Sequence, residues 1–515
     1  MKNDQDNLPL RKTPSGEQID TRPIQIEQWL TTLSYADFDK TGQLLYEATL
    51  ATNLQLVKPS VRMELVELYN RPYQYYIDSR IKTEAQYTLQ SIETAQSQVN
   101  ILKRIAMNLG YACKMAAEEE LKQKTLWRHT KPPLPAMLSA LNYLSHALIF
   151  SYLEYSPIPK KIWQEINFIY DYAETLGKEN TILPLPASDA GHTTNTIAQA
   201  YKRLVLASLA DPYQLPFGAI WEIFEQLHSW AGYVHITRYS ATDAPAGYFV
   251  VDLNGDSAPV PYFKFNQERI TDKHRLIDAT RLSKLIQEKC ALLNRGEKLK
   301  DNLRLSPHYA RLILGHLSQA WSLPPKRYFP REERRGMLYM TCGLKAVYFS
   351  INRETEYFPE QDDTAASPDY EAEEWELVDQ SLGGVAVIRN ARPSCDVRIG
   401  DLVAMSNDRE KINWTVGVVR WMMVYKTRNY KIGIQVISKT ALAVAVRALS
   451  GSAQDCRFQR ALSVSEGGEQ SLITTKGLYM KDRELEIKTQ DGTFEVKATS
   501  MKESTLGFEH FNIRR

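Results

Sequence analysis

The main change of periodicity in the sequence lies at Leu323-Pro324-Pro325, and this change restricts the possible folds more than any other feature. Before these residues, apolar side chains recur three or four positions apart, as on one face of a helix, most clearly over 82–122. After them, short β-rich runs alternate with turns, which is typical of a β-barrel. A chain of 515 residues also exceeds one ordinary hydrophobic core. We therefore expect an α + β multidomain protein, with an N-terminal all-α helical region followed by an all-β barrel and extra C-terminal strands.

Turn signals and changes in composition divide the chain further. Residues 1–23 are polar and charged and are expected to form a disordered tail. Helical subdomains are expected at 24–180 and at 190–322. The second should carry a β-hairpin flap near 247–263, where Asn254-Gly255 is a strong turn signal. The remaining expected parts are a linker at 323–336, a barrel at 337–450 and a C-terminal β extension at 451–515.

Five runs of residues are expected to form strands of the barrel. They are 344–351 (LKAVYFSI), 384–390 (GVAVIRN), 401–406 (DLVAMS), 414–425 (WTVGVVRWMMVY) and 430–438 (YKIGIQVIS). These runs are rich in β-branched or aromatic residues, which favour strands. An acidic and poorly periodic segment at 356–374 interrupts the series, and we interpret it as an exposed, mobile insertion.

The charge balance and the cysteines argue against several classes of protein. Lys and Arg number 63 against 61 Asp and Glu, so the formal net charge is only +2. This balance argues against a nucleic-acid coat protein or a polybasic membrane binder. The five cysteines are scattered without a CxxC pair, which predicts neither a disulfide framework nor a zinc site. The sequence shows no secretory signal and no run of about 18 apolar residues. We therefore expect a cytoplasmic protein without membrane insertion.

Sequence motifs for catalysis are missing. There is no HExxH, GxSxG, P-loop or Rossmann glycine pattern, and the nine histidines include no pair with metal-ligand spacing beside suitable carboxylates. We therefore expect no catalytic residues, no metal and no cofactor. An enzyme built from dispersed residues stays open as an alternative.

Two short motifs lie beside the expected strands at the start of the β-rich half. One is RxxxR, formed by Arg331 and Arg335, and the other is DxSxxG, formed by Asp379, Ser381 and Gly384. Each motif is common by itself, so the signal lies in their combination, because both occur in this order with barrel-like strands after them. The residues singled out by the motifs and their neighbours are Arg331, Arg334, Arg335, Asp379, Ser381, Gly383 and Gly384.

This arrangement resembles the PilZ domains. The resemblance covers about 326–450 and includes the later runs GDLVA, VGVVRW and YKIGIQVIS. It implies a PilZ-like β-barrel that binds cyclic di-GMP, with the seven residues above as ligand contacts. It also implies that the linker at 323–336 belongs to the binding site and becomes ordered when ligand binds.

The chemistry of these side chains suits such a ligand. Guanidinium groups pair bidentately with phosphate, or with the O6 and N7 edge of guanine. Asp379 can accept hydrogen bonds from guanine N1 and N2, and Ser381 offers a small hydroxyl. Gly384 either lets the backbone approach closely or adopts a positive φ angle.

We therefore expect a non-enzymatic cytosolic receptor that binds cyclic di-GMP and relays the signal through the helical region to an unidentified partner protein. One alternative is a degenerate PilZ-like interaction scaffold with little or no ligand binding. Another is an enzyme in the helical half that the barrel regulates. At the level of residues, the plainer alternative is that the arginines pair with Glu332, Glu333 and the acidic segment on a solvated face. In the same way, Asp379 to Gly384 can be read as a simple Asx turn.

Overall fold

The computed structural model divides the chain into two compact units. One unit comprises residues 1–212 and 217–325, and the other comprises residues 213–216 and 326–515. The structure describes residues 20–81, 92–124, 131–184, 195–243, 246–295, 297, 299, 307–322, 330–352, 372–389, 397–408, 413–425, 429–452 and 455–515.

Several of the expected features fall partly outside the described residues. They include residues 1–19 of the tail, 82–91 of the periodic helical stretch, 323–329 of the linker, 356–371 of the acidic segment and 390 of the expected strand at 384–390.

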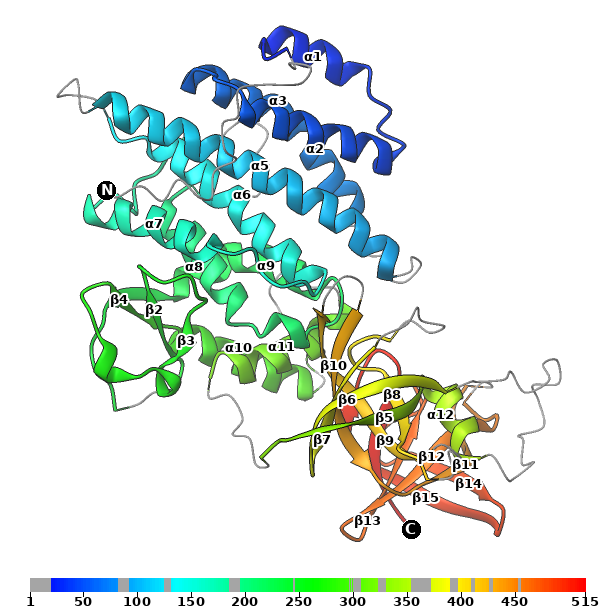
Figure 1. Ribbon diagram of the computed structural model, residues 1–515. Helices are drawn as coiled ribbons and strands as arrows, with labels where there is room; N and C mark the ends of the chain where they lie inside the picture. Colours follow the sequence, from blue (N-terminus) through cyan, green and yellow to red (C-terminus); the bar gives the residue numbers. More distant parts are fainter. Residues whose placement is uncertain are drawn as a thin grey trace. The chain divides into compact units, whose positions relative to one another are not determined.

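The first unit is built mainly of helices. Their bounds are α1 Pro23–Thr31, α2 Phe38–Leu54, α3 Pro59–Arg80, α5 Ile92–Lys124, α6 Leu134–Leu153, α7 Ile162–Thr175, α8 Ile197–Ser208, α9 Ala219–Trp230, α10 Thr280–Asn294 and α11 Pro307–Ala320. Helices α5 and α6 lie side by side (Figure 1). Helix α5 covers the described part of the periodic stretch at 82–122.

Short polar residues and one glycine determine where several helices begin and end. Asp37 accepts a hydrogen bond from the Lys40 amide at 3.2 Å and caps the start of α2. Thr196 does the same for α8 through the Gln199 amide, also at 3.2 Å. Gly177 follows α7 with φ 63° and closes its last turn, because only a residue without a Cβ adopts this angle at little cost.

Helix α6 is the core of this unit. It is apolar on nearly all sides, and residues such as Leu141, Leu144 and Phe150 have no exposed surface. By length and composition it is long enough to cross a membrane, but 83% of the apolar window is buried inside the unit. A helix that is apolar on all sides needs apolar surroundings, and for α6 the rest of the unit supplies them.

The first unit also contains a small antiparallel sheet that the sequence analysis found only in part. Its strands are β1 His235–Arg238, β2 Tyr248–Asp252, β3 Val260–Pro261 and β4 His274–Asp278, in the order β1-β4-β2-β3. The expected hairpin at 247–263 corresponds to β2 and β3. The outer strands β1 and β3 are too short to show a clear alternation in sequence.

The hairpin is held against α7. The carboxylate of Asp256, between β2 and β3, accepts hydrogen bonds from the backbone amides of Lys161 and Trp163 at 2.6 and 3.1 Å. These amides lie at the N-terminal end of α7, which carries a partial positive charge. Asn167 on α7 also donates to the carbonyl oxygens of Asp252 and Gly255 at 3.1 Å. These hydrogen bonds hold the hairpin in place within the helical unit.

The second unit contains two closed barrels, and the first follows the linker. Its strands are β5 Glu332–Cys342, β6 Glu373–Ser381, β7 Gly384–Ile388, β8 Leu402–Ser406, β9 Thr415–Tyr425 and β10 Asn429–Ser438. They close in the order β10-β7-β6-β5-β8-β9, and neighbouring strands are antiparallel. The last part of the expected linker, 332–336, is the beginning of β5. Glu373 and Glu374, from the end of the expected acidic insertion, belong to β6.

The prediction of a strand at 344–351 is wrong, because these residues form helix α12, Leu344–Ile351. Gly343, with φ 88°, ends β5 and turns the chain into the helix. Val347 and Tyr348 are fully buried between the two barrels. Burial of this helical face outweighs the β propensity of the individual residues, which is a weak local preference.

The expected C-terminal β extension is a second closed barrel. Its strands are β11 Ala441–Ala448, β12 Gln459–Glu466, β13 Glu469–Thr474, β14 Glu484–Thr489, β15 Gly492–Ser504 and β16 Glu509–Arg514, in the closed order β11-β12-β13-β16-β15-β14. Its first strand, β11, lies before the expected boundary at 450. With the helical unit and the first barrel, it confirms the expected α + β multidomain class.

One hydrophobic cluster connects the two barrels with α12. Members of this cluster come from α12, from β8 and β9 of the first barrel, and from β12 and β13 of the second. At its edge, Arg420 on β9 donates to Gln435 Oε1 at 2.7 Å and forms an ion pair with Glu503 on β15. The barrels are therefore packed as one body.

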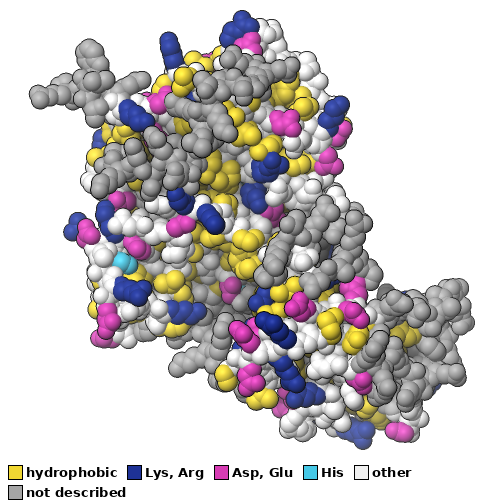
Figure 2. Space-filling model, viewed as in Figure 1, with side chains coloured by type: hydrophobic (Ala, Val, Ile, Leu, Met, Phe, Trp, Pro, Cys, Tyr) yellow, Lys and Arg dark blue, Asp and Glu magenta, His cyan; other side chains and the backbone are white. Residues whose placement is uncertain are grey.

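Charged side chains of both signs are interspersed on the surface. Figure 2 shows basic and acidic residues mixed over the visible face of both units. This distribution agrees with the near-zero net charge, and no single sign of charge dominates that face.

Candidate ligand-binding site

The two sequence motifs meet at one end of the first barrel. The start of β5 pairs with the end of β6, with Glu332 opposite Gln380 and Glu333 opposite Asp379. Arg331, just before β5, donates from Nη1 to Asp379 Oδ1 at 2.9 Å. The structure therefore brings the RxxxR and DxSxxG motifs together through an ion pair between their first residues.

The DxSxxG motif forms the tight turn between β6 and β7. Ser381 pairs with Gly384 across this turn, and Ser381 Oγ donates to the Gly384 carbonyl oxygen at 3.2 Å. The Gly383 carbonyl accepts from the Val436 amide of β10 at 3.0 Å. These contacts connect the turn to the strand behind it.

Gly384 is needed for close packing of the backbone. A Cβ at this position would lie 2.5 Å from the Ile434 carbonyl oxygen of β10, well inside van der Waals contact. Its φ angle lies outside the left-handed region, so glycine is required here by the closeness of β10 and not by a positive φ angle.

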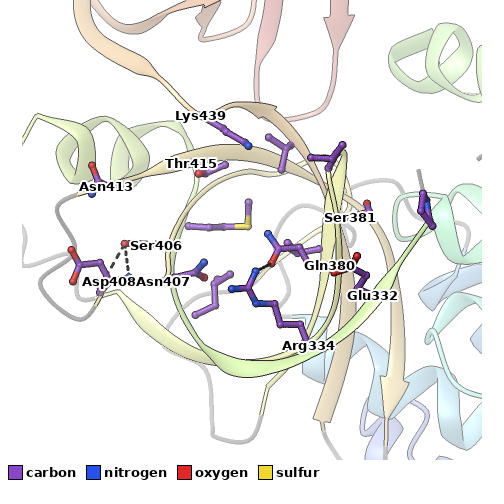
Figure 3. Close-up of a pocket in the computed structure, with 16 residues that line it drawn as sticks. Glu332, Arg334, Gln380, Ser381, Ser406, Asn407, Asp408, Asn413, Thr415 and Lys439 are labelled. Carbon is purple, nitrogen blue, oxygen red and sulfur yellow. Dashed lines mark hydrogen bonds between the residues drawn. The ribbon is translucent and has the colours of Figure 1, made fainter. Parts of the chain in front are cut away.

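The residues of the site lie on two faces of the barrel wall, beside an irregularity in the pairing of β5 with β6. The pairing of β5 with β6 shifts between Glu333 and Gly336, where β5 carries an extra residue. Asp379 and Gln380 are successive residues of β6, so their side chains point to opposite faces. The Arg331–Asp379 pair is outside the barrel mouth, whereas Arg334 Nη1 donates to Gln380 Oε1 at 3.2 Å on the inner side (Figure 3).

Arg335 lies within the shifted region of β5 and is exposed. Among the described residues, its side chain has no hydrogen-bond or ion-pair partner. Of the three predicted arginines, Arg331 contacts the DxSxxG motif, Arg334 enters the barrel mouth and Arg335 faces solvent.

The mouth of the first barrel contains a pocket of about 570 Å³. Its throat is apolar and is lined by Leu338, Val385, Met405 and Val436. Its polar lining comes from the ends of all the surrounding strands except β7 (Figure 3). These polar residues are Glu332, Arg334, Gln380, Ser381, Ser406, Asn407, Asp408, Asn413, Thr415 and Lys439.

Sequence reasoning did not find the pocket residues Gln380, Asn407 and Lys439. Gln380 lies near the end of β6, and Asn407 and Lys439 come directly after β8 and β10. These strand ends are distant in sequence and meet only because the barrel closes. The one local signal was the place of Gln380 between the motif residues Asp379 and Ser381.

Comparison with known families agrees with this architecture. Three family models match consecutive parts of the chain. They are described as the N-terminal domain of the cyclic-di-GMP receptor FimW (residues 24–242), its middle PilZ domain (248–368 and 352–442) and the FimW C-terminal β-barrel domain (444–515).

The chain belongs to the FimW family of PilZ-domain proteins. This membership confirms the resemblance that the two motifs carried. The chain is similar to the cyclic-di-GMP receptor FimW of Pseudomonas aeruginosa PAO1, with 24% identity over 529 aligned positions. The match covers 90% of this chain and 85% of that relative, so it extends across both units. We refer to the first barrel below as the PilZ barrel.

Proposed function

We propose that this protein is a non-enzymatic cytoplasmic receptor that binds cyclic di-GMP at the outer edge of its PilZ barrel. The observation that carries this proposal is the ion pair between Arg331 and Asp379, which joins the two motifs at one surface. The description of the similar FimW receptor supports the identity of the ligand. No cofactor takes part in this function.

The Arg331–Asp379 pair is suited to exchange with a ligand. The exposed fractions of the two side chains are 36% and 17%, and an ion pair this close to solvent contributes only about 0–1 kcal/mol. When the ligand arrives, Arg331 turns to a phosphate and Asp379 accepts from the N1 and N2 groups of a guanine. Each charge-assisted hydrogen bond contributes about 1.5–3 kcal/mol. Two stronger contacts therefore replace one weak contact.

We further propose that the helical unit passes the signal to a partner protein. This unit contains more than half of the chain and has its own core around α6. A pull-down with the full-length protein, with and without cyclic di-GMP, tests this part of the proposal. A partner captured equally in both conditions would contradict a ligand-dependent relay.

The arginine and the aspartate are expected to be needed for binding. Arg331→Ala and Asp379→Ala should each weaken cyclic di-GMP binding by about 1.5–3 kcal/mol, which is about tenfold to somewhat over a hundredfold. Isothermal titration calorimetry measures this loss directly. Thermal unfolding should hardly change, because an ion pair in contact with solvent contributes little to stability.

Arg457→Ala provides the matched control, since Arg457 is an exposed arginine between β11 and β12 of the second barrel. It should bind cyclic di-GMP like the parent. If the parent itself does not bind, the scaffold alternative is favoured. If the parent binds cyclic di-GMP and both site variants bind it as tightly as the parent, the roles given to Arg331 and Asp379 are wrong.

A further inference from the structure

We infer that the mouth of the PilZ barrel is a base-binding pocket, into which one guanine of cyclic di-GMP inserts, with Gln380 as a residue that determines specificity. This inference rests on the proposed function and deepens it, because the motif residues outside the mouth contact a phosphate and one guanine and leave the second guanine without a site.

The size and lining of the pocket suit a planar heteroaromatic ring. Its volume of about 570 Å³ falls within the range of about 300–1,000 Å³ that is usual for small-molecule sites. The apolar throat of Leu338, Val385, Met405 and Val436 offers contact surface to the faces of a ring. The polar groups are confined to the mouth, where they can reach the edge of the same ring.

Arg334 and Gln380 are already aimed into the mouth (Figure 3). Their hydrogen bond uses one of the five N–H donors of Arg334 and leaves the others available for guanine O6 and N7. The Gln380 amide can donate to O6 through its nitrogen, or accept from N1–H through its oxygen. Asn407 lies across the mouth and offers the same pair of functions.

The charges of the lining favour a neutral base over a phosphate. Arg334 and Lys439 contribute two cations, and Glu332 and Asp408 contribute two carboxylates, so the charges balance. A phosphate inside the mouth would be repelled by the two carboxylates of the lining, whereas these groups can accept from the N1–H and N2–H donors of guanine. The phosphates therefore remain at Arg331, outside the mouth.

The inner and outer sites are adjacent, so one ligand can occupy both. Ser381 belongs to the DxSxxG motif and also lines the pocket. Asp379 and Gln380 are successive residues with opposite orientations, one at each site. Cyclic di-GMP, with its bases projecting from a phosphate ring, can place a phosphate at Arg331 while one base crosses the edge of the barrel.

Two substitutions in the full-length protein test the inference. Gln380→Leu removes the amide but keeps a similar volume, and Val436→Phe fills the throat. Isothermal titration with cyclic di-GMP and with cyclic di-AMP should show about tenfold weaker cyclic di-GMP binding by each variant. Gln380→Leu should also narrow the preference for cyclic di-GMP over cyclic di-AMP, because adenine lacks the O6 and N1–H groups that the amide recognises. The matched control is Gln470→Leu, at an exposed position of β13, which should bind like the parent.

The outcomes separate this inference from the proposed function. If both variants bind cyclic di-GMP within about twofold of the parent while Arg331→Ala binds more weakly, no base enters the mouth and the inference is wrong, although the proposed function stands. If the parent does not bind cyclic di-GMP, the proposed function fails first. If circular dichroism shows that Val436→Phe does not fold, Gln380→Leu decides alone through its ligand preference.

Discussion

Gly384→Ala is expected to destabilise the PilZ barrel by about 2–3 kcal/mol, near the upper end of the usual effect of overpacking. The new methyl group would lie 2.5 Å from the Ile434 carbonyl oxygen. Gly384 is paired with Gln435 in the β10–β7 ladder, so the obstacle is backbone that is itself fixed by hydrogen bonds. A side chain could rotate away from such a clash, but this carbonyl can move only if the two strands separate.

Gly336→Ala provides a matched control within the same barrel. A Cβ at Gly336 would meet no atom within 4 Å. This substitution should therefore change stability little, or increase it by about 0.4–1 kcal/mol because alanine restricts the unfolded chain. Urea-induced unfolding of the full-length protein, followed by tryptophan fluorescence, compares the two. Equal stability of the two variants would show that the strands at Gly384 separate without appreciable loss of free energy.

Gly384→Ala should also weaken cyclic di-GMP binding, because separation of β7 from β10 moves the turn that carries Asp379 and Ser381. Gly336→Ala changes no contact of that turn. A Gly384→Ala protein that unfolds at a lower urea concentration than the parent but binds cyclic di-GMP with full affinity would show that the turn keeps its geometry without close strand packing.

His510 is expected to make the second barrel sensitive to acid. Its side chain is 6% exposed, and Nε2 lies 2.9 Å from Ser471 Oγ. Burial lowers the pKa of His510 from its ordinary value of 6.5 to about 4, with a further decrease from Lys502 and an opposing effect of Glu503. The folded barrel therefore keeps this imidazole neutral at a pH where the unfolded chain would protonate it.

The sign of the effect follows from this depressed pKa. Above about pH 6.5, His510 is neutral in both the folded and the unfolded chain, so it costs the folded barrel no stability. As the pH falls from about 6.5 towards 4, the unfolded state gains a proton that the folded state does not, and stability is lost. The shift corresponds to a loss of about 3 kcal/mol once the pH is below 4.

His510→Gln should remove this acid-dependent loss of stability while keeping a hydrogen-bonding group near Ser471. Urea unfolding at pH 7.5 and at pH 4.5 should show that the parent loses about 2 kcal/mol more stability than the variant over this interval. The matched control, His235→Gln, changes an exposed histidine of β1 and should follow the parent at both values. Equal acid sensitivity of the parent and His510→Gln would show that His510 is protonated in the folded barrel as readily as in the unfolded chain.

The sequence alone supported the main division of the chain and the identity of its motifs. Both depend on local patterns, which persist whatever the rest of the chain does. The periodicity over 82–122 predicts a helix because its apolar residues return to one face, and α5 confirms this over the described part. The spacing of Arg331, Arg335, Asp379, Ser381 and Gly384 can be read directly, and the family comparison confirms the resemblance that it carried.

Only the tertiary structure decided which way these side chains point and what surrounds them. A shift of one residue in strand pairing exchanges the two faces of a strand, and no local pattern marks the shift that places Asp379 outside the mouth and Gln380 inside it. Residues 344–351 have the composition of a strand but form α12, because the space between the two barrels accepts a helical face. The pocket exists only because the ends of distant strands meet when the barrel closes, so its lining depends on contacts between residues that are far apart in the sequence.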